Sequence, residues 1–194
     1  MNSQRGTPAS APSRQVDKAG RFDQVSIALH WLTVVLILSQ FTTALLVGQV
    51  SGATAVAAIT VHRSTGAVTW VVVVTRLVWR SRFASLPPFP ASMPKIQQLV
   101  AKLNEYGLYA LLLVQPVTGI AFTLLRGRPF ALLFWQVPAL VAADRPLAHI
   151  LYSVHIIGAW ALLGLIGLHA GAALLHGVVL RDGVLPRMLP WTAR

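Results

Sequence analysis

Four long apolar runs, separated by short polar segments, dominate the pattern along the chain. They cover residues 25–47, 55–79, 103–125 and 148–175. Each is at least as long as the about 20 residues that a helix needs to cross a hydrocarbon core of about 30 Å. The pattern predicts an all-α fold, a transmembrane four-helix bundle over residues 22–190.

Two segments depart from these runs. Residues 1–21 are rich in Ser, Pro, Ala and basic side chains and lack the apolar core of a signal peptide, so we expect a disordered, solvent-facing tail. Residues 130–142 are apolar but too short to span and are interrupted by a proline. We expect them at the membrane interface or in a re-entrant loop, with Trp135 as an interfacial anchor.

Composition supports burial in lipid. The chain is 55% hydrophobic and 11% charged, with a mean hydropathy of +0.65, whereas soluble domains carry about 25% charged residues. The net charge of +11 is unusual, and basic proteins often bind nucleic acid. Here the cations lie at the ends of the apolar runs, as membrane topology requires, so we expect a lipid bilayer and no nucleic acid as partner.

The distribution of these cations predicts an orientation. Of the 16 Lys and Arg residues, only four fall in the loops that are outside if the N-terminus is inside. The excess of positive charge on the other side places both termini in the cytoplasm. The four outer residues are Arg63, Arg126, Arg128 and Arg145. They either steer a small anionic donor toward the outer face or are ordinary loop charges.

The chain contains no cysteine. Thiolate metal sites, cysteine-ligated iron–sulfur clusters and covalently attached c-type haem are therefore excluded. All six histidines fall within or beside the apolar runs. Ionisable residues inside membrane helices are costly and usually face a functional interior, so the histidines are the main candidates for a site.

Four of the histidines form two pairs. His155 and His169 are 14 residues apart, which places them on one face of a helix and about 21 Å apart along it. His30 lies near the inner end of the first run, and His62 near the outer end of the second. Depth therefore pairs His30 with His169 and His62 with His155. Such pairs across a bundle hold b-type haem, so we predict two haems b with these four residues as axial ligands of the iron.

Other polar residues admit more than one role. His149 falls on a different face and is expected at the interface. His176 shares the face of His169 at the inner surface, where it contacts a haem propionate, contacts a quinone or simply lies at the interface. Arg76 and Arg80 are one turn apart near the inner end of the second run. They pair either with haem propionates or with lipid phosphate.

Small residues follow three of the predicted ligands at a distance of one helical turn. These residues are Gly66, Gly158 and Ala173. We interpret them as leaving room for the flat face of a porphyrin. Small residues also let membrane helices pack closely together, which is the alternative.

Several of these motifs together resemble the bacterial cytochrome b561 family over roughly residues 22–190. The carrying residues are Leu29-His30-Trp31, Val61-His62-Arg63-Ser64-Thr65-Gly66, Arg76-Leu77-Val78-Trp79-Arg80, Pro116-Val117-Thr118-Gly119, the block from Gly167 to His176, and Arg187-Met188-Leu189-Pro190. Four helices point to the bacterial branch, since the eukaryotic proteins have six. Some relatives carry a histidine where this chain has Asn104-Glu105-Tyr106, and many have Trp in place of Val154.

The resemblance implies two haem b groups ligated by His30, His62, His155 and His169, electron exchange with ubiquinone, and a place in the bacterial inner membrane. Some members oxidise superoxide at the outer face and pass the electron to quinone. The leading hypothesis is thus a quinone-linked oxidoreductase, with the quinone pool and superoxide as partners. The alternatives are a cytochrome b membrane subunit for a separate dehydrogenase or hydrogenase, and a haem-free channel, transporter or chaperone. A homodimer or a redox partner subunit fits either redox hypothesis.

Overall fold

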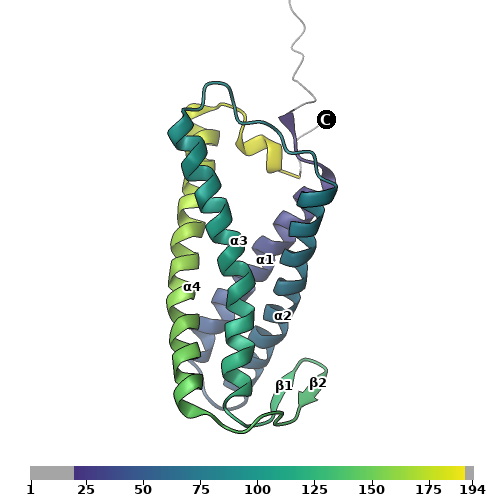
Figure 1. The fold of residues 1–194 in the computed structure, drawn as a ribbon, viewed down its shortest axis with the longest axis vertical. Helices are drawn as coiled ribbons and strands as arrows, with labels where there is room; N and C mark the ends of the chain where they lie inside the picture. Colours follow the sequence, from purple (N-terminus) through teal and green to yellow (C-terminus); the bar gives the residue numbers. More distant parts are fainter. Residues whose placement is uncertain (1–19, 191–194) are drawn as a thin grey trace, which may run out of the picture.

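Four long helices make up most of the structure, a computed structural model that describes residues 20–190 (Figure 1). They are α1 (Gln24–Val47), α2 (Gly52–Arg82), α3 (Lys95–Leu124) and α4 (Arg145–Leu174). All four are long and apolar enough to cross a membrane, which confirms the predicted all-α transmembrane bundle. The expected N-terminal tail lies, up to residue 19, outside the described residues.

Three of the helices extend beyond the apolar runs that predicted them. Helix α3 begins at Lys95 instead of residue 103, and α2 ends at Arg82 instead of residue 79. An apolar run marks only the part of a helix that lipid surrounds, whereas the helix itself continues into the polar interface. The extensions carry Lys and Arg side chains, which suit that interface.

The bundle consists of two helical hairpins. Helix α1 packs mainly on α2, α3 packs mainly on α4, and α2 joins the hairpins by packing on α3. Val73, Leu112 and Leu162 form a buried apolar cluster that draws on α2, α3 and α4. This cluster lies midway along the helices and forms the dry centre of the bundle.

The first and last described residues lie at the same end of the bundle, which we call the terminal end (Figure 1). Beyond α4 the chain forms a π-helical turn η2 (Leu175–Leu180) and a short 3-10 helix η3 (Leu185–Met188). The indole of Trp31 donates a hydrogen bond of 2.8 Å to the carbonyl of Met188. Arg187 donates one of 2.7 Å to the carbonyl of Pro88. The C-terminal segment is thereby fastened across the terminal end.

A small β-hairpin closes the opposite end, which we call the hairpin end (Figure 1). Strands β1 (Phe130–Leu132) and β2 (Trp135–Val137) pair antiparallel. From the sequence we expected this segment either at the membrane interface or in a re-entrant loop, and we did not predict strands. The hydroxyl of Ser64 accepts a hydrogen bond of 2.9 Å from the backbone N–H of Leu133, which fixes the hairpin to α2. Trp135 is 76% exposed, as suits an aromatic anchor at the interface.

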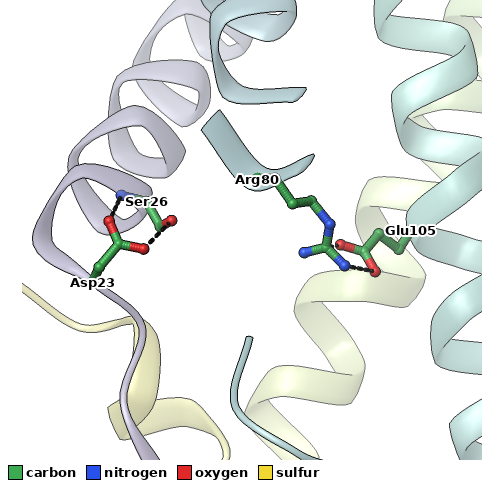
Figure 2. A network of polar contacts seen from close by, with 4 residues as sticks. All are labelled: Asp23, Ser26, Arg80 and Glu105. Carbon is green, nitrogen blue, oxygen red and sulfur yellow. Dashed lines mark hydrogen bonds and ion pairs between the residues drawn. The ribbon is translucent and has the colours of Figure 1, made fainter. Parts of the chain in front are cut away.

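Helix α1 begins at an N-cap that also contacts α2. The carboxylate of Asp23 accepts hydrogen bonds from the backbone N–H and the hydroxyl of Ser26, at 2.9 and 2.6 Å (Figure 2). It also accepts one of 3.0 Å from the indole of Trp79. Partial burial alone raises the pKa of Asp23, but the hydrogen bonds from Ser26 and Trp79 outweigh it and bring the pKa below its ordinary value of 3.8.

Replacing Asp23 with alanine is expected to lower the free energy of unfolding by about 1 kcal/mol at neutral pH, the usual cost of losing such a cap. Because the folded pKa is depressed, the contribution of this carboxylate is complete above pH 3.8 and is lost as the pH falls through the folded pKa. Denaturation of the wild type and of Asp23→Ala in detergent should show a difference in the free energy of unfolding that becomes smaller in acid. Equal stability at neutral pH would contradict the role of the cap.

Candidate functional site

Two pairs of histidine rings face each other at opposite ends of the bundle. At the terminal end, the ring centres of His30 on α1 and His169 on α4 are 6.1 Å apart. At the hairpin end, those of His62 on α2 and His155 on α4 are 6.3 Å apart. The structure therefore brings together the partners that depth and helical face predicted from the sequence.

The separation of the rings suits one metal ion between them. Two bonds of about 2 Å from a metal to imidazole nitrogen, with about 1 Å from each nitrogen to its ring centre, span about 6 Å. The helices that meet in these pairs, α1 with α4 and α2 with α4, are not those whose backbones pack closely. Within residues 20–190 no group of three His, Asp or Glu side chains gathers, so each pair offers a metal two protein ligands.

At the hairpin end, hydrogen bonds decide which nitrogen of His62 is free. Its Nδ1 lies 3.1 Å from the backbone carbonyl oxygen of Gln40. A carbonyl only accepts, so Nδ1 carries the hydrogen and Nε2 keeps its lone pair for a ligand bond. The hydroxyl of Thr43 is 3.1 Å from the same Nδ1. The side-chain amide of Gln40 donates a bond of 3.0 Å to the carbonyl of His62.

His155 has the same surroundings, supplied by α3. Its Nδ1 lies 3.0 Å from the carbonyl oxygen of Gln115 and 3.2 Å from the hydroxyl of Thr118. The amide of Gln115 donates a bond of 2.9 Å to the carbonyl of His155. A Cβ at Gly119 would lie 3.1 Å from Cε1 of His155, so the missing side chain lets the ring approach α3. Nε2 is again the free nitrogen.

The structure shows what lies above two of the small residues. A Cβ at Gly158 would lie 2.8 Å from Oε1 of Gln115, and one at Gly66 would lie 3.6 Å from the amide of Gln40. These glycines make room for glutamine side chains on the neighbouring helix. Their contacts support the alternative interpretation, in which small residues let membrane helices pack closely together.

The terminal-end pair lacks such hydrogen bonds. Nδ1 of His30 and the hydroxyl of Tyr109 are buried without a hydrogen-bond partner among residues 20–190. The guanidinium of Arg76 lies 5.5 Å from the centre of the Tyr109 ring, and its positive charge acts on both His30 and His169. Unpaired polar groups are costly inside a membrane, so this end has buried polar atoms that suit an additional polar group.

The two arginines expected at this end have different surroundings. Arg80 forms an ion pair of 2.8 Å with Glu105 of α3 (Figure 2). Arg76, one turn earlier, forms no ion pair within the described chain, although Glu105 acts on it at longer range, and its charge also acts on His30.

The remaining two histidines lie apart from the pairs. His176 is buried on the π-helical turn, where its Nδ1 pairs with the carboxylate of Asp182. Burial tends to raise the pKa of Asp182, but its hydrogen bond with His176 and one from the backbone of Val184 lower it overall. His149 is exposed, as expected for an interfacial residue.

A basic cavity of about 540 Å³ opens at the hairpin end. Its lining includes Arg126, Arg128, Arg145 and His149. Phe122, on the cavity wall, has its ring centre 6.0 Å from that of His155. The sequence indicated the positive charge of these loops, but the cavity depends on how the loops fold.

Comparison with known proteins agrees with this geometry. The model of the family described as prokaryotic cytochrome b561 matches residues 21–191. The chain belongs to this family. It is 31% identical over 170 residues to the "Probable superoxide oxidase CybB" of Yersinia pestis, covering 88% of this chain and 96% of that protein. It is 29% identical over 174 residues to "Cytochrome b561 homolog 1" of Escherichia coli strain K12, covering 88% and 97%. It is also 28% identical over 172 residues to "Cytochrome b561 homolog 2" of the same strain, covering 87% and 91%.

Membership of the cytochrome b561 family confirms the resemblance seen in the sequence. It makes the chain a bacterial membrane protein of electron transfer and implies haem b as the cofactor. The residues present fit that group. His62 and His155 each have Nε2 free, and their ring centres are 6.3 Å apart, a separation that suits iron. At the terminal end, Nδ1 of His30 and the hydroxyl of Tyr109 are buried and have no hydrogen-bond partner among residues 20–190.

Sequence reasoning on this cytochrome missed four polar residues that contact the histidines. They are Gln40, Thr43, Gln115 and Thr118. A signal was present, because Gln-x-x-Thr occurs in the first apolar run and again in the third. Polar residues repeated at the same spacing within apolar runs indicate a buried partner.

Replacing Gly119 with alanine is expected to push the ring of His155 away from α3 and to weaken haem binding at the hairpin end by about tenfold, the scale of outer-shell changes at metal sites. A matched control is Gly167→Ala on α4, where an added Cβ meets nothing within 4 Å. Haem titration of the apoprotein, followed by absorbance, measures both. Equal affinity in the two variants would contradict the close approach of His155 to α3.

Proposed function

We propose that this cytochrome carries electrons across the bacterial inner membrane through two haems b. Its axial ligands are His30 with His169 and His62 with His155. The observation that carries the proposal is the pair of ring separations, 6.1 and 6.3 Å, at opposite ends of one bundle. Both separations suit an iron ion between two imidazoles.

When bound, haem b supplies reversible one-electron chemistry at its iron. The chain supplies the rest. The imidazoles hold the iron, and α4 contributes one ligand at each end, about 21 Å apart along its axis. The apolar cluster of Val73, Leu112 and Leu162 fills the bundle between the two levels and excludes water there. The electron therefore crosses the membrane inside a dry, rigid bundle.

At the terminal end, we assign a propionate contact to Arg76. Its guanidinium acts on both His30 and His169 and forms no ion pair in the described chain, since the nearby Glu105 is paired with Arg80. Guanidinium binds carboxylate well. Arg80, the second arginine predicted there, is engaged by Glu105 and contacts a propionate only by exchanging that partner.

The same end offers a site for ubiquinone. His176 is buried, and Asp182 holds its Nδ1. If Nδ1 donates to that carboxylate, Nε2 accepts a hydrogen bond from a quinol hydroxyl. Ubiquinone takes up two electrons and two protons to become ubiquinol, so a site with a histidine and a carboxylate near the aqueous interface suits this chemistry.

At the hairpin end, superoxide is the proposed donor. The basic cavity lined by Arg126, Arg128 and Arg145 lies beside Phe122, which contacts His155. Positive charge concentrates a small anion. Two superoxide ions each lose one electron to become dioxygen, and these two electrons reduce one ubiquinone. One relative of this chain is named a probable superoxide oxidase, which supports the choice of donor.

The charge distribution supports an orientation with both termini in the cytoplasm. Of the twelve Lys and Arg residues among residues 20–190, eight belong to the terminal end, and bacterial membrane proteins retain such loops inside. The hairpin end and its basic cavity would then face the periplasm, where superoxide is the substrate.

The His169→Ala variant is expected to halve the haem-to-protein ratio, because the terminal-end site loses a ligand while the hairpin-end site keeps both. The His62→Ala variant should also halve the haem-to-protein ratio, because the hairpin-end site then loses a ligand. A pyridine haemochrome assay on purified protein measures the ratio. His149→Ala is the matched control on the same helix as His169, since an exposed residue away from the pairs should leave the ratio unchanged.

The outcome separates the competing hypotheses. A colourless wild-type protein from haem-sufficient cells would overturn the proposal in favour of a haem-free channel or transporter. A normal haem content, with activity only when a dehydrogenase or hydrogenase co-purifies, would favour the membrane-subunit hypothesis. Reduction of ubiquinone by superoxide with the purified chain alone would support the enzyme.

A further inference from the structure

The two histidines at the hairpin end have matching surroundings built from different helices. For His62, α1 supplies Gln40 and Thr43; for His155, α3 supplies Gln115 and Thr118. In each case the glutamine carbonyl and the threonine hydroxyl approach Nδ1, and the glutamine amide bonds the histidine's own carbonyl. We call each such pair of residues a Gln–Thr support.

We infer that the two Gln–Thr supports are positioning residues that make the hairpin-end ligands strong electron donors and so give this end the lower reduction potential of the two. The inference rests on the proposed role of His62 and His155 as haem ligands. It assigns Gln40, Thr43, Gln115 and Thr118 a function that goes beyond the ligand set itself.

The chemistry follows from the direction of each hydrogen bond. The hydroxyl of Thr43 lies 2.7 Å from the carbonyl of Ser39 and donates there. Its lone pairs are then available to Nδ1 of His62, which shares its hydrogen between this hydroxyl and the carbonyl of Gln40. Thr118 donates in the same way to the carbonyl of Gln115, at 2.9 Å. An imidazole that donates from Nδ1 is a more basic ligand at Nε2.

A more basic ligand stabilises ferric iron more than ferrous iron, which lowers the reduction potential. At the hairpin end both ligands donate a hydrogen bond from Nδ1, so both lower the reduction potential of the same site. The glutamine side chains contribute orientation, because each ties the backbone of its histidine to the neighbouring helix. Gly66 and Gly158 provide the space that these side chains occupy.

The terminal end differs in both respects. Nδ1 of His30 has no hydrogen-bond partner in the part of the chain that the structure describes. The guanidinium of Arg76 acts on both ligands of that end, whereas the carboxylate of Glu105 acts on His169 alone and is itself paired with Arg80. A net positive charge near the iron favours its reduced, less positive state. The terminal-end site thus has the higher potential. An electron lost by the hairpin-end site is gained by the terminal-end site in a downhill step.

Redox titration of variants tests the supports. Thr43→Val and Thr118→Val remove one acceptor from each Nδ1 at nearly constant volume. We expect the lower of the two midpoint potentials to shift upward in each variant, to shift further in the double variant, and to return in Thr43→Ser and Thr118→Ser. The higher potential and the haem content should stay unchanged.

The matched control is Thr33→Val. Thr33 is buried on α1, and its hydroxyl bonds the carbonyl of Leu29 within its own helix, so neither potential should move. Electron paramagnetic resonance adds a second readout. In Gln40→Leu and Gln115→Leu the signal of one ferric low-spin haem should broaden as its ligand loses a fixed orientation, while the other signal is retained.

A second measurement tests which end of the bundle has which reduction potential, and it does not require the threonine variants to fold. His62→Ala leaves only the terminal-end haem, which should titrate at the higher of the two wild-type potentials. Titration at the lower value would overturn the inference, as would unmoved potentials in both valine variants or an equal shift in Thr33→Val. Wild-type protein without haem would instead refute the proposed function, so the two failures are distinct.

Discussion

The hydrogen bond from imidazole Nδ1 to a backbone carbonyl of the neighbouring helix determines much of this structure. Inside a lipid bilayer no water is available to form hydrogen bonds with a polar group, so its hydrogen-bond partner must come from the protein. For His62 and His155 the partner is a glutamine carbonyl at 3.1 and 3.0 Å. The bond fixes the tautomer, leaves Nε2 free, and requires α1 to lie against α2 and α3 against α4. Ligand chemistry and helix packing therefore share one interaction.

The bundle is nearly symmetric at one end and asymmetric at the other. Both helical hairpins bring a Gln-x-x-Thr segment against a histidine at the hairpin end. At the terminal end the pair consists of His30 and His169, with Arg76 beside it and no matching support among residues 20–190. Two histidine pairs thus differ in their surroundings. Under the proposed function, that difference gives electron transfer a direction along the bundle.

Hydrophobic pattern and histidine depth predicted the four helices and the partners in each pair, because both depend on the periodicity and rise of single helices. The sequence did not predict the β-hairpin at residues 130–137, whose place depends on a contact with Ser64 far away in the chain. It also did not predict that Gly66 and Gly158 lie against the side chains of Gln40 and Gln115. Which side chain fills the space above a glycine depends on how two helices are rotated, and no local pattern records that rotation.

The fastening of the C-terminal segment bears on the order in which the protein is completed. The carbonyl of Met188 accepts a hydrogen bond from Trp31, and that of Leu189 accepts one from Arg21, both near the start of the first span. A nascent chain still held in the ribosome beyond residue 180 already possesses all four spans and all four paired histidines, yet lacks this cover. The contacts of residues 187–189 with the first span therefore form only after the fourth span has been made, so the terminal end is covered after the four paired histidines are already in the chain.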